Sequence, residues 1–272
     1  MEYYDIGKDI IAFTTDRSIG RDEEKVRAEL SGQPPLSGGA RRELRFARPH
    51  QTHTDKILNV SDEFFDLPGN IRQLLLQGID AVITRSRYTI LGVSTADCIP
   101  VIVYDPVHHA AAAIHAGWKG TVRRIVQKVI NEMHLAFRTN AEDCLAVIGP
   151  GISLDSFEVG AEVVDAFVEA GLIDGDTDPM RENALLSYYR RNGDTFTKIT
   201  AAEDIPTGKP HLNLKRINLH QLLKAGLRSE NITISPIDTF TNPDFFSARR
   251  EQAPGGEKCG RMLTGFVLAD MN

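Results

Sequence analysis

Short apolar runs recur along this chain, and each is bounded by glycine, proline or polar residues that favour turns. Continuous apolar runs that are rich in β-branched residues predict strands covered on both faces. The predicted strands span residues 8–14, 55–60, 80–86, 89–95, 99–106, 108–117, 144–152, 232–240 and 262–268.

Other stretches repeat their apolar residues with the period of a helix. Residues 121–137 carry apolar side chains at the spacing of one amphipathic helix, namely Val122, Ile125, Val126, Val129, Ile130 and Met133. Further helices are predicted at residues 21–30, 68–78, 160–171 and 212–227. Strands interleaved with helices in this way indicate the α/β class. We expect one domain over residues 1–272, with a mixed β-sheet and flanking helices.

Two segments lack either pattern. Residues 31–40, "SGQPPLSGGA", are rich in glycine, proline and serine, and residues 172–210 are polar and weakly patterned. We expect both segments to be mobile loops.

Composition narrows the class of protein. The chain has 272 residues, 42% of them hydrophobic, which is ordinary for a globular protein with a sizeable core. A net charge of −6 gives no electrostatic reason to expect nucleic acid as a partner. Three cysteines (Cys98, Cys144 and Cys259) are too few for a disulfide framework and suggest a reducing compartment. With no secretory leader and no membrane span in the pattern, a cytoplasmic location is expected; the oligomeric state is not indicated.

Two predicted strands end near residues that can bind a metal. Cys98 follows one strand and His115 lies at the end of another, while His50 and His53 precede a third. A thiolate with two imidazoles suits zinc or copper, and three protein ligands with an open fourth position are typical of catalytic zinc. Spacing alone leaves other interpretations open, because a lone cysteine after a strand is often only a small buried side chain.

Several short motifs follow one another in a characteristic order. They are "QTH" (51–53), "DAVIT" (80–84), "TADCIPV" (95–101), "HAGWKGT" (115–121), "IGPGIS" with "FEVGAEV" (148–163) and "FFSARR" (245–250). With these motifs the chain resembles the laccase-domain family, also called the polyphenol oxidase or purine nucleoside phosphorylase family, from Ile11 onward. The resemblance implies the laccase-domain fold, which is similar to that of cytotoxic necrotizing factor. It also implies that His53, Cys98 and His115 bind Zn²⁺, with copper as the alternative, and it selects His53 over His50.

The same resemblance implies an activity on purine nucleosides. The expected reaction is phosphorolysis of adenosine, inosine, guanosine or methylthioadenosine to the free base and ribose-1-phosphate, with adenosine deamination as a second activity. Two alternatives are a copper-dependent polyphenol oxidase (laccase) and a zinc amidase that acts on a cell-wall precursor. Eight histidines scattered over the chain are few for a multicopper oxidase.

Candidate catalytic and binding residues lie close to these motifs. Asp97, next to Cys98, is expected either to shuttle a proton in deamination or to brace its loop. Arg17, Lys119 and Arg249 are the cations expected to hold phosphate, because arginine binds phosphate through two parallel hydrogen bonds. Of the pair Arg249–Arg250, Arg249 is assigned the catalytic contact. The paired glycines that the family has after Arg17 are missing here, and Phe240 replaces the cysteine that many members carry before Thr241.

Overall fold

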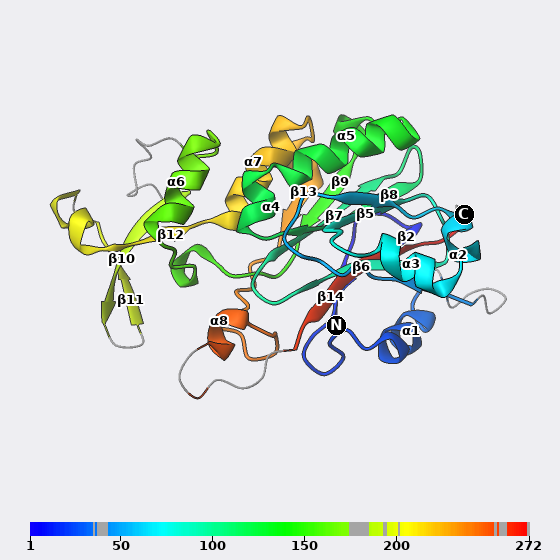
Figure 1. Ribbon diagram of the computed structural model, residues 1–272, viewed down its shortest axis with the longest axis horizontal. Helices are drawn as coiled ribbons and strands as arrows, with labels where there is room; N and C mark the ends of the chain where they lie inside the picture. Colours follow the sequence, from blue (N-terminus) through cyan, green and yellow to red (C-terminus); the bar gives the residue numbers. More distant parts are fainter. Residues whose placement is uncertain are drawn as a thin grey trace.

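The computed structural model describes residues 1–34, 36, 43–173, 185–192, 195–200, 202–252, 255 and 260–270 (Figure 1). The strands are β1 (Glu2–Tyr4), β2 (Ile10–Thr14), β3 (Arg45–Ala47), β4 (Ile57–Asn59), β5 (Ala81–Thr84), β6 (Thr89–Thr95), β7 (Ile99–Asp105), β8 (Ala110–Ala116), β9 (Leu145–Ile148), β10 (Leu186–Asn192), β11 (Thr195–Lys198), β12 (Lys209–Leu212), β13 (Ile232–Ile234) and β14 (Met262–Leu268). The α-helices are α1 (Glu23–Ser31), α2 (Asp62–Asp66), α3 (Gly69–Leu75), α4 (Trp118–Val122), α5 (Ile125–Phe137), α6 (Ala161–Glu169), α7 (Leu214–Lys224) and α8 (Ala248–Glu251).

One sheet has five strands in the order β1-β2-β14-β6-β3. Its centre is β14, which pairs antiparallel with β2 on one side and with β6 on the other. Gly92 and Gly265 face each other across β6 and β14, and a Cβ atom on Gly265 would lie only 2.3 Å from the Leu91 carbonyl oxygen. Glycine at this pair therefore allows the two backbones to approach closely.

A second sheet has six strands in the order β13-β9-β7-β8-β5-β4. Antiparallel pairing of β7 with β8 sets Ile99 opposite Ala116, so the start of β7 and the end of β8 share one edge. Parallel β4 and β5 both begin at that same edge, because β5 pairs antiparallel with β8. Side chains alternate along β7, so that Val101 and Val103 face one core while Ile102 and Tyr104 face another.

The two sheets pack face to face between layers of helices, as Figure 1 shows. The core between the sheets joins strands β2, β6 and β14 to strands β5, β7 and β8. Helices α5 and α7 cover the outer face of the six-stranded sheet, and Val26 and Leu30 of α1 pack on the outer face of the five-stranded sheet. The α/β class with mixed sheets and flanking helices is thus confirmed, with two stacked sheets where one was expected. None of the helices in the described segments has the length and apolar character that crossing a membrane requires.

Three of the segments assigned from the sequence differ in the structure. The single helix expected over residues 121–137 is divided into α4 and α5, because Arg124 adopts φ 60°, a left-handed conformation that interrupts the helix. The strand expected over residues 232–240 ends at Ile234, just before Ser235 and Pro236, and proline cannot donate a hydrogen bond to a neighbouring strand.

The third difference concerns the two expected loops. Within 172–210 the described residues include β10, β11 and the start of β12, which form a three-stranded sheet beside α6. The alternation in "LSYYRRN" was too weak to stand out, so this part of the segment was wrongly assigned to a loop. Of residues 31–40, Ser31 ends α1, and residues 35 and 37–40 lie outside the described residues. The mobility of both segments stays a prediction.

Candidate metal centre

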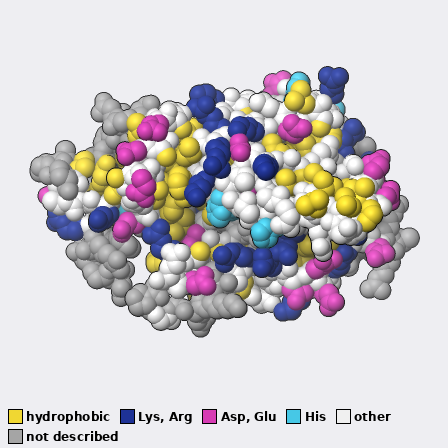
Figure 2. Space-filling model, in the orientation of Figure 1, with side chains coloured by type: hydrophobic (Ala, Val, Ile, Leu, Met, Phe, Trp, Pro, Cys, Tyr) yellow, Lys and Arg dark blue, Asp and Glu magenta, His cyan; other side chains and the backbone are white. Residues whose placement is uncertain are grey.

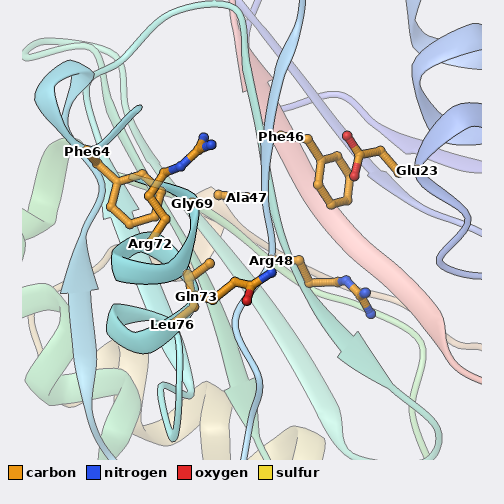
Figure 3. A pocket seen from close by; sticks show the side chains of 9 residues that line it. All are labelled: Glu23, Phe46, Ala47, Arg48, Phe64, Gly69, Arg72, Gln73 and Leu76. Atoms are coloured by element: carbon orange, nitrogen blue, oxygen red, sulfur yellow. The ribbon is translucent and has the colours of Figure 1, made fainter. Parts of the chain in front are cut away.

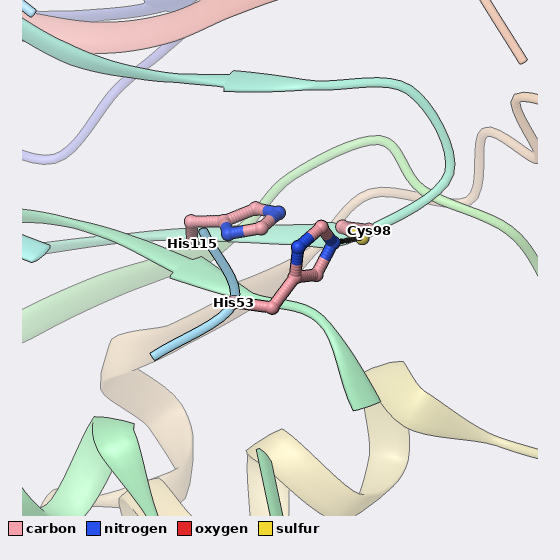
Figure 4. Close-up of side chains that lie close together, drawn as sticks. All are labelled: His53, Cys98 and His115. Atoms are coloured by element: carbon pink, nitrogen blue, oxygen red, sulfur yellow. Dashed lines mark hydrogen bonds between the residues drawn. The ribbon is translucent and has the colours of Figure 1, made fainter. Parts of the chain in front are cut away.

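Three potential metal donors converge at the edge of the six-stranded sheet. His53 lies in the loop before β4, Cys98 directly precedes β7, and His115 is the penultimate residue of β8. Their ligand atoms all lie within 4.8 Å of one another, and the Cys98 Sγ and His53 Nε2 atoms are 3.8 Å apart (Figure 4). Among the described residues this is the one group of three or more such side chains that could hold a metal ion. We call these three residues the donor wall.

Asp80, which was not predicted as a site residue, holds two members of the donor wall in place through hydrogen bonds. Its Oδ1 atom lies 2.7 Å from Nδ1 of His115, so this buried carboxylate holds the proton on Nδ1 and leaves Nε2 as the donor to a metal. The other hydrogen bonds to Asp80 come from the loop that carries His53. The donors are the amides of Thr52, His53 and Thr54, and the hydroxyl of Thr54. One carboxylate therefore fixes both imidazoles.

Electrostatics favour the thiolate form of Cys98. Burial by itself would raise the pKa of the Cys98 thiol, but the charge of His115 and its hydrogen bond, together with the contact to His53, lower it to about 6. Burial would lower the pKa of His115, yet the Cys98 thiolate and Asp80 raise it. A thiolate at neutral pH is the form of cysteine that binds metals.

Backbone geometry at the centre is unusual for the residues present. His53 has φ 61° and Asp97 has φ 82°, which are left-handed conformations that non-glycine residues rarely adopt. Gly117 follows β8, and a Cβ atom there would lie 3.0 Å from Cys98 Sγ and 3.1 Å from His53 Cδ2, so a side chain at this position would press on two of the donors. Strained residues that are held by surrounding contacts are common at functional sites.

Asp97 points its carboxylate to the loop before α8. Its Oδ1 atom accepts a hydrogen bond of 2.8 Å from the Thr239 hydroxyl. Its Oδ2 atom accepts bonds from the Ser247 hydroxyl and the Arg249 amide, at 3.0 and 2.7 Å. Because Asp97 is buried and fully hydrogen-bonded in this way, the arrangement favours the bracing role over the proton shuttle.

A cleft of about 590 Å³ opens beside the donor wall. Another part of its lining consists of Arg21, Arg48 and Arg261, which we call the arginine wall. Arg48 follows β3, Arg261 precedes β14, and Arg21 precedes α1. Figure 2 shows histidine side chains beside a band of lysine and arginine side chains on this face of the molecule. No aspartate or glutamate lines this cleft in the described part of the chain.

The cations expected from the sequence lie elsewhere. Arg17 lines a separate cavity of about 460 Å³, and its guanidinium lies over the Phe246 ring. Lys119 is exposed on α4 beside Trp118. The guanidinium of Arg249 donates to the Glu158 carbonyl oxygen, and that of Arg250 donates to backbone carbonyls of its own loop. The structure therefore does not bring Arg17, Lys119 or Arg249 into the cleft that contains the metal donors.

Comparisons with known proteins cover most of this chain. A family model described as "Multi-copper polyphenol oxidoreductase laccase" matches residues 22–269. A purine nucleoside phosphorylase of Bacteroides thetaiotaomicron is 40% identical over 250 residues, which are 92% of this chain and 82% of that protein. The adenosine deaminase RL5, from an unknown prokaryotic organism, is 34% identical over 219 residues, 80% of this chain and 73% of that protein. Among solved structures, the hypothetical protein YfiH of Bacillus licheniformis has a TM-score of 0.69 at 26% identity, covering 95% of this chain and 92% of that one.

Proposed function

This chain belongs to the multi-copper polyphenol oxidoreductase laccase family, and from that premise we propose that it is a zinc-dependent enzyme that acts on purine nucleosides. The proposed reaction is phosphorolysis of adenosine, inosine, guanosine or methylthioadenosine to the free base and ribose-1-phosphate. The names of its relatives support an enzyme with a small-molecule substrate.

The convergence of His53, Cys98 and His115 at the cleft carries this proposal. One thiolate and two imidazoles fit zinc, and three protein ligands leave a position open to the cleft, as in catalytic rather than structural sites. When bound, the metal would supply Lewis acidity that polarises an oxygen atom in the cleft. The volume of about 590 Å³ is within the usual range for sites that bind small organic ligands.

The side chains of the cleft favour phosphorolysis over deamination. Phosphorolysis needs cations that hold a phosphate while the glycosidic bond breaks, and the arginine wall provides them. Deamination needs an acid or base that moves protons to and from the purine ring, and because no carboxylate lines the described cleft, only histidines could supply it there. Adenosine deamination remains the second candidate because RL5 carries that name, and His50, which lines the cleft, is the residue we would assign to proton transfer.

Product analysis tests the proposal. Purified zinc-loaded protein is incubated with adenosine, with and without inorganic phosphate, and the products are separated by chromatography. We expect adenine and ribose-1-phosphate only when phosphate is present, whereas inosine formed without phosphate would establish the deaminase instead. Absence of both products with every purine nucleoside would overturn the proposal. Copper in the purified protein together with turnover of phenols would support the oxidase.

A matched variant controls for nonspecific loss of activity. His108 contacts Asp105 at the opposite edge of the six-stranded sheet, with 2.9 Å between Nδ1 and Oδ2. The His108→Ala variant is therefore expected to keep its zinc and its products, whereas His115→Ala loses both.

A further inference from the structure

The arginine wall has the features of an oxyanion site. The three arginines come from segments far apart in the sequence and line one cleft, where β3 and β6 end and the antiparallel β14 begins. In the described part of the chain, none of Arg21, Arg48 and Arg261 forms an ion pair, whereas Arg27, Arg45, Arg87 and Arg228 each do.

Arg48 is held by a contact with β6. Its guanidinium donates a hydrogen bond of 3.2 Å to the Ser94 hydroxyl, and Ser94 is held in turn by the Gln51 side chain, which bonds both its amide and its carbonyl. The Nε atom of Arg48 is buried and has no hydrogen-bond partner within the protein. Among the hydrogen bonds of the described residues, the bond to Ser94 is the one that the Arg48 guanidinium makes, so an oxyanion that accepts from its terminal nitrogen atoms would be stabilising.

Arg48 also stands between two cavities. Besides the cleft, it lines a smaller cavity of about 370 Å³ between α1 and α3, which Figure 3 shows together with Glu23. Burial and the like charge of Arg21 lower the pKa of the Arg48 guanidinium, whereas the negative charge of Glu23 raises it. Two neighbouring cations at the rim of one cleft repel each other, and an anion between them removes that repulsion.

The geometry points to a phosphate-binding subsite formed by Arg21, Arg48 and Arg261, facing the same cleft as the metal donors. Planar guanidinium groups bind phosphate oxygens through paired hydrogen bonds, whereas an uncharged ligand would leave the three charges uncompensated. This inference rests on the proposed function in one respect: the ligand expected beside the subsite, in the same cleft, is a purine nucleoside. The phosphate could come from free inorganic phosphate, as the second substrate, or from the phosphate ester of a nucleotide.

Binding measurements on the full-length, metal-loaded protein test the subsite without relying on turnover. Isothermal titration calorimetry is performed with inorganic phosphate, adenosine and adenosine 5′-monophosphate. For Arg48→Gln and Arg261→Gln we expect phosphate to bind about tenfold more weakly, with Arg21→Gln less affected because Arg21 is exposed. Arg48→Lys keeps the charge without the planar fork and should fall between the wild type and Arg48→Gln. Arg85→Gln is the control, since Arg85 is an exposed arginine after β5 at the opposite edge of the other sheet.

The two sources of phosphate give different results. If inorganic phosphate binds and adenosine 5′-monophosphate binds no more tightly than adenosine, the subsite serves free phosphate. If the monophosphate binds much more tightly than adenosine, and this advantage is lost in Arg48→Gln, the subsite serves a nucleotide. Wild-type protein that binds neither, or variants that bind both as the wild type does, would overturn the subsite. Weakened phosphate binding in a protein that shows no phosphorolysis would leave the subsite intact and count against the proposed function alone.

Discussion

The donor wall and the arginine wall border one cleft but are held in place by different means. His115 is only 4% exposed, and its imidazole is tied to a buried carboxylate that also fixes the loop of His53. Arg21, by contrast, is exposed. In the described part of the chain, the Arg261 guanidinium donates one hydrogen bond, to the carbonyl oxygen of the neighbouring Gly260. In the donor wall, one hydrogen-bond network holds several residues, so a substitution in it should disturb more than one metal donor. In the arginine wall the charges act separately, so each substitution should remove only part of the affinity for an anion.

The largest effect is expected when a donor itself is removed. Cys98→Ala should abolish metal binding and turnover while the protein stays folded, because Cys98 is partly exposed and contributes little to the core. Added zinc should raise the Tm of the wild type and leave that of the variant unchanged, since only a ligand that binds the native state stabilises it. Loss of the folded state in Cys98→Ala, seen by circular dichroism, would indicate a structural metal instead.

Removing the carboxylate behind the donors should have the next largest effect. Asp80→Asn should weaken zinc binding by about 10- to 100-fold, the usual cost of losing the partner of a metal-bound histidine. Competition with a chromogenic chelator measures this affinity. Asp105 offers a matched control, because it is also buried and bonds a histidine, His108, but at the other edge of the sheet. Asp105→Asn should therefore lose stability without losing zinc affinity; equal affinities in both variants would contradict the role of Asp80.

In the metal-free protein, the pH dependence of stability should differ between substitutions in the two walls. Burial would raise the pKa of Asp80, but hydrogen bonds from His115 and Thr54 lower it from 3.8 to about 2. Its ionised form therefore contributes about 2 kcal/mol to stability above pH 4, and this contribution is lost as the pH falls toward 2. Urea unfolding between pH 5 and pH 2 should show a smaller decline in Asp80→Asn than in the wild type. Arg48→Gln should decline as the wild type does, because arginine stays charged throughout this range.

The smallest expected effect is the coupling between the walls. Asp80 and Arg48 share no hydrogen-bond partner in the described structure, so their effects on zinc affinity should add. A double-mutant cycle with Asp80→Asn and Arg48→Gln should give a coupling energy below about 0.5 kcal/mol. A coupling above about 1 kcal/mol would show that the walls act as one unit.

Local sequence patterns were sufficient to predict the strands and helices that are regular and buried. The apolar runs of β6, β7 and β8 and the helical spacing of α5 and α6 are visible in any short window of the sequence. Short or half-exposed elements such as β1, β3 and α8 were missed, because three or four residues carry no measurable period. The turn at Arg124 was missed for another reason, since nothing in its sequence marks a positive φ.

Only the residues of the candidate site that lie in the family motifs could be predicted from the sequence. The family resemblance selected His53, Cys98 and His115, which the structure brings together. Asp80 had a usable signal, an acidic residue directly before a fully buried strand, since a charge in that position needs partners. The arginine wall had no such signal, because Arg21, Arg48 and Arg261 line one cleft only once the five-stranded sheet has formed.

The central position of β14 in the five-stranded sheet has a consequence for the order in which the molecule can form. Strands β2 and β6 are joined only through β14, so that sheet cannot close until residues 262–268 have been synthesised and inserted. The strands next to the metal donors all precede residue 117, and with β5 they form the continuous set β7-β8-β5-β4. During translation, a nascent chain could therefore bring the three donors together well before Arg261 leaves the ribosome. Under the proposed function, ion uptake would mark an early stage of folding, whereas anion binding would mark its completion.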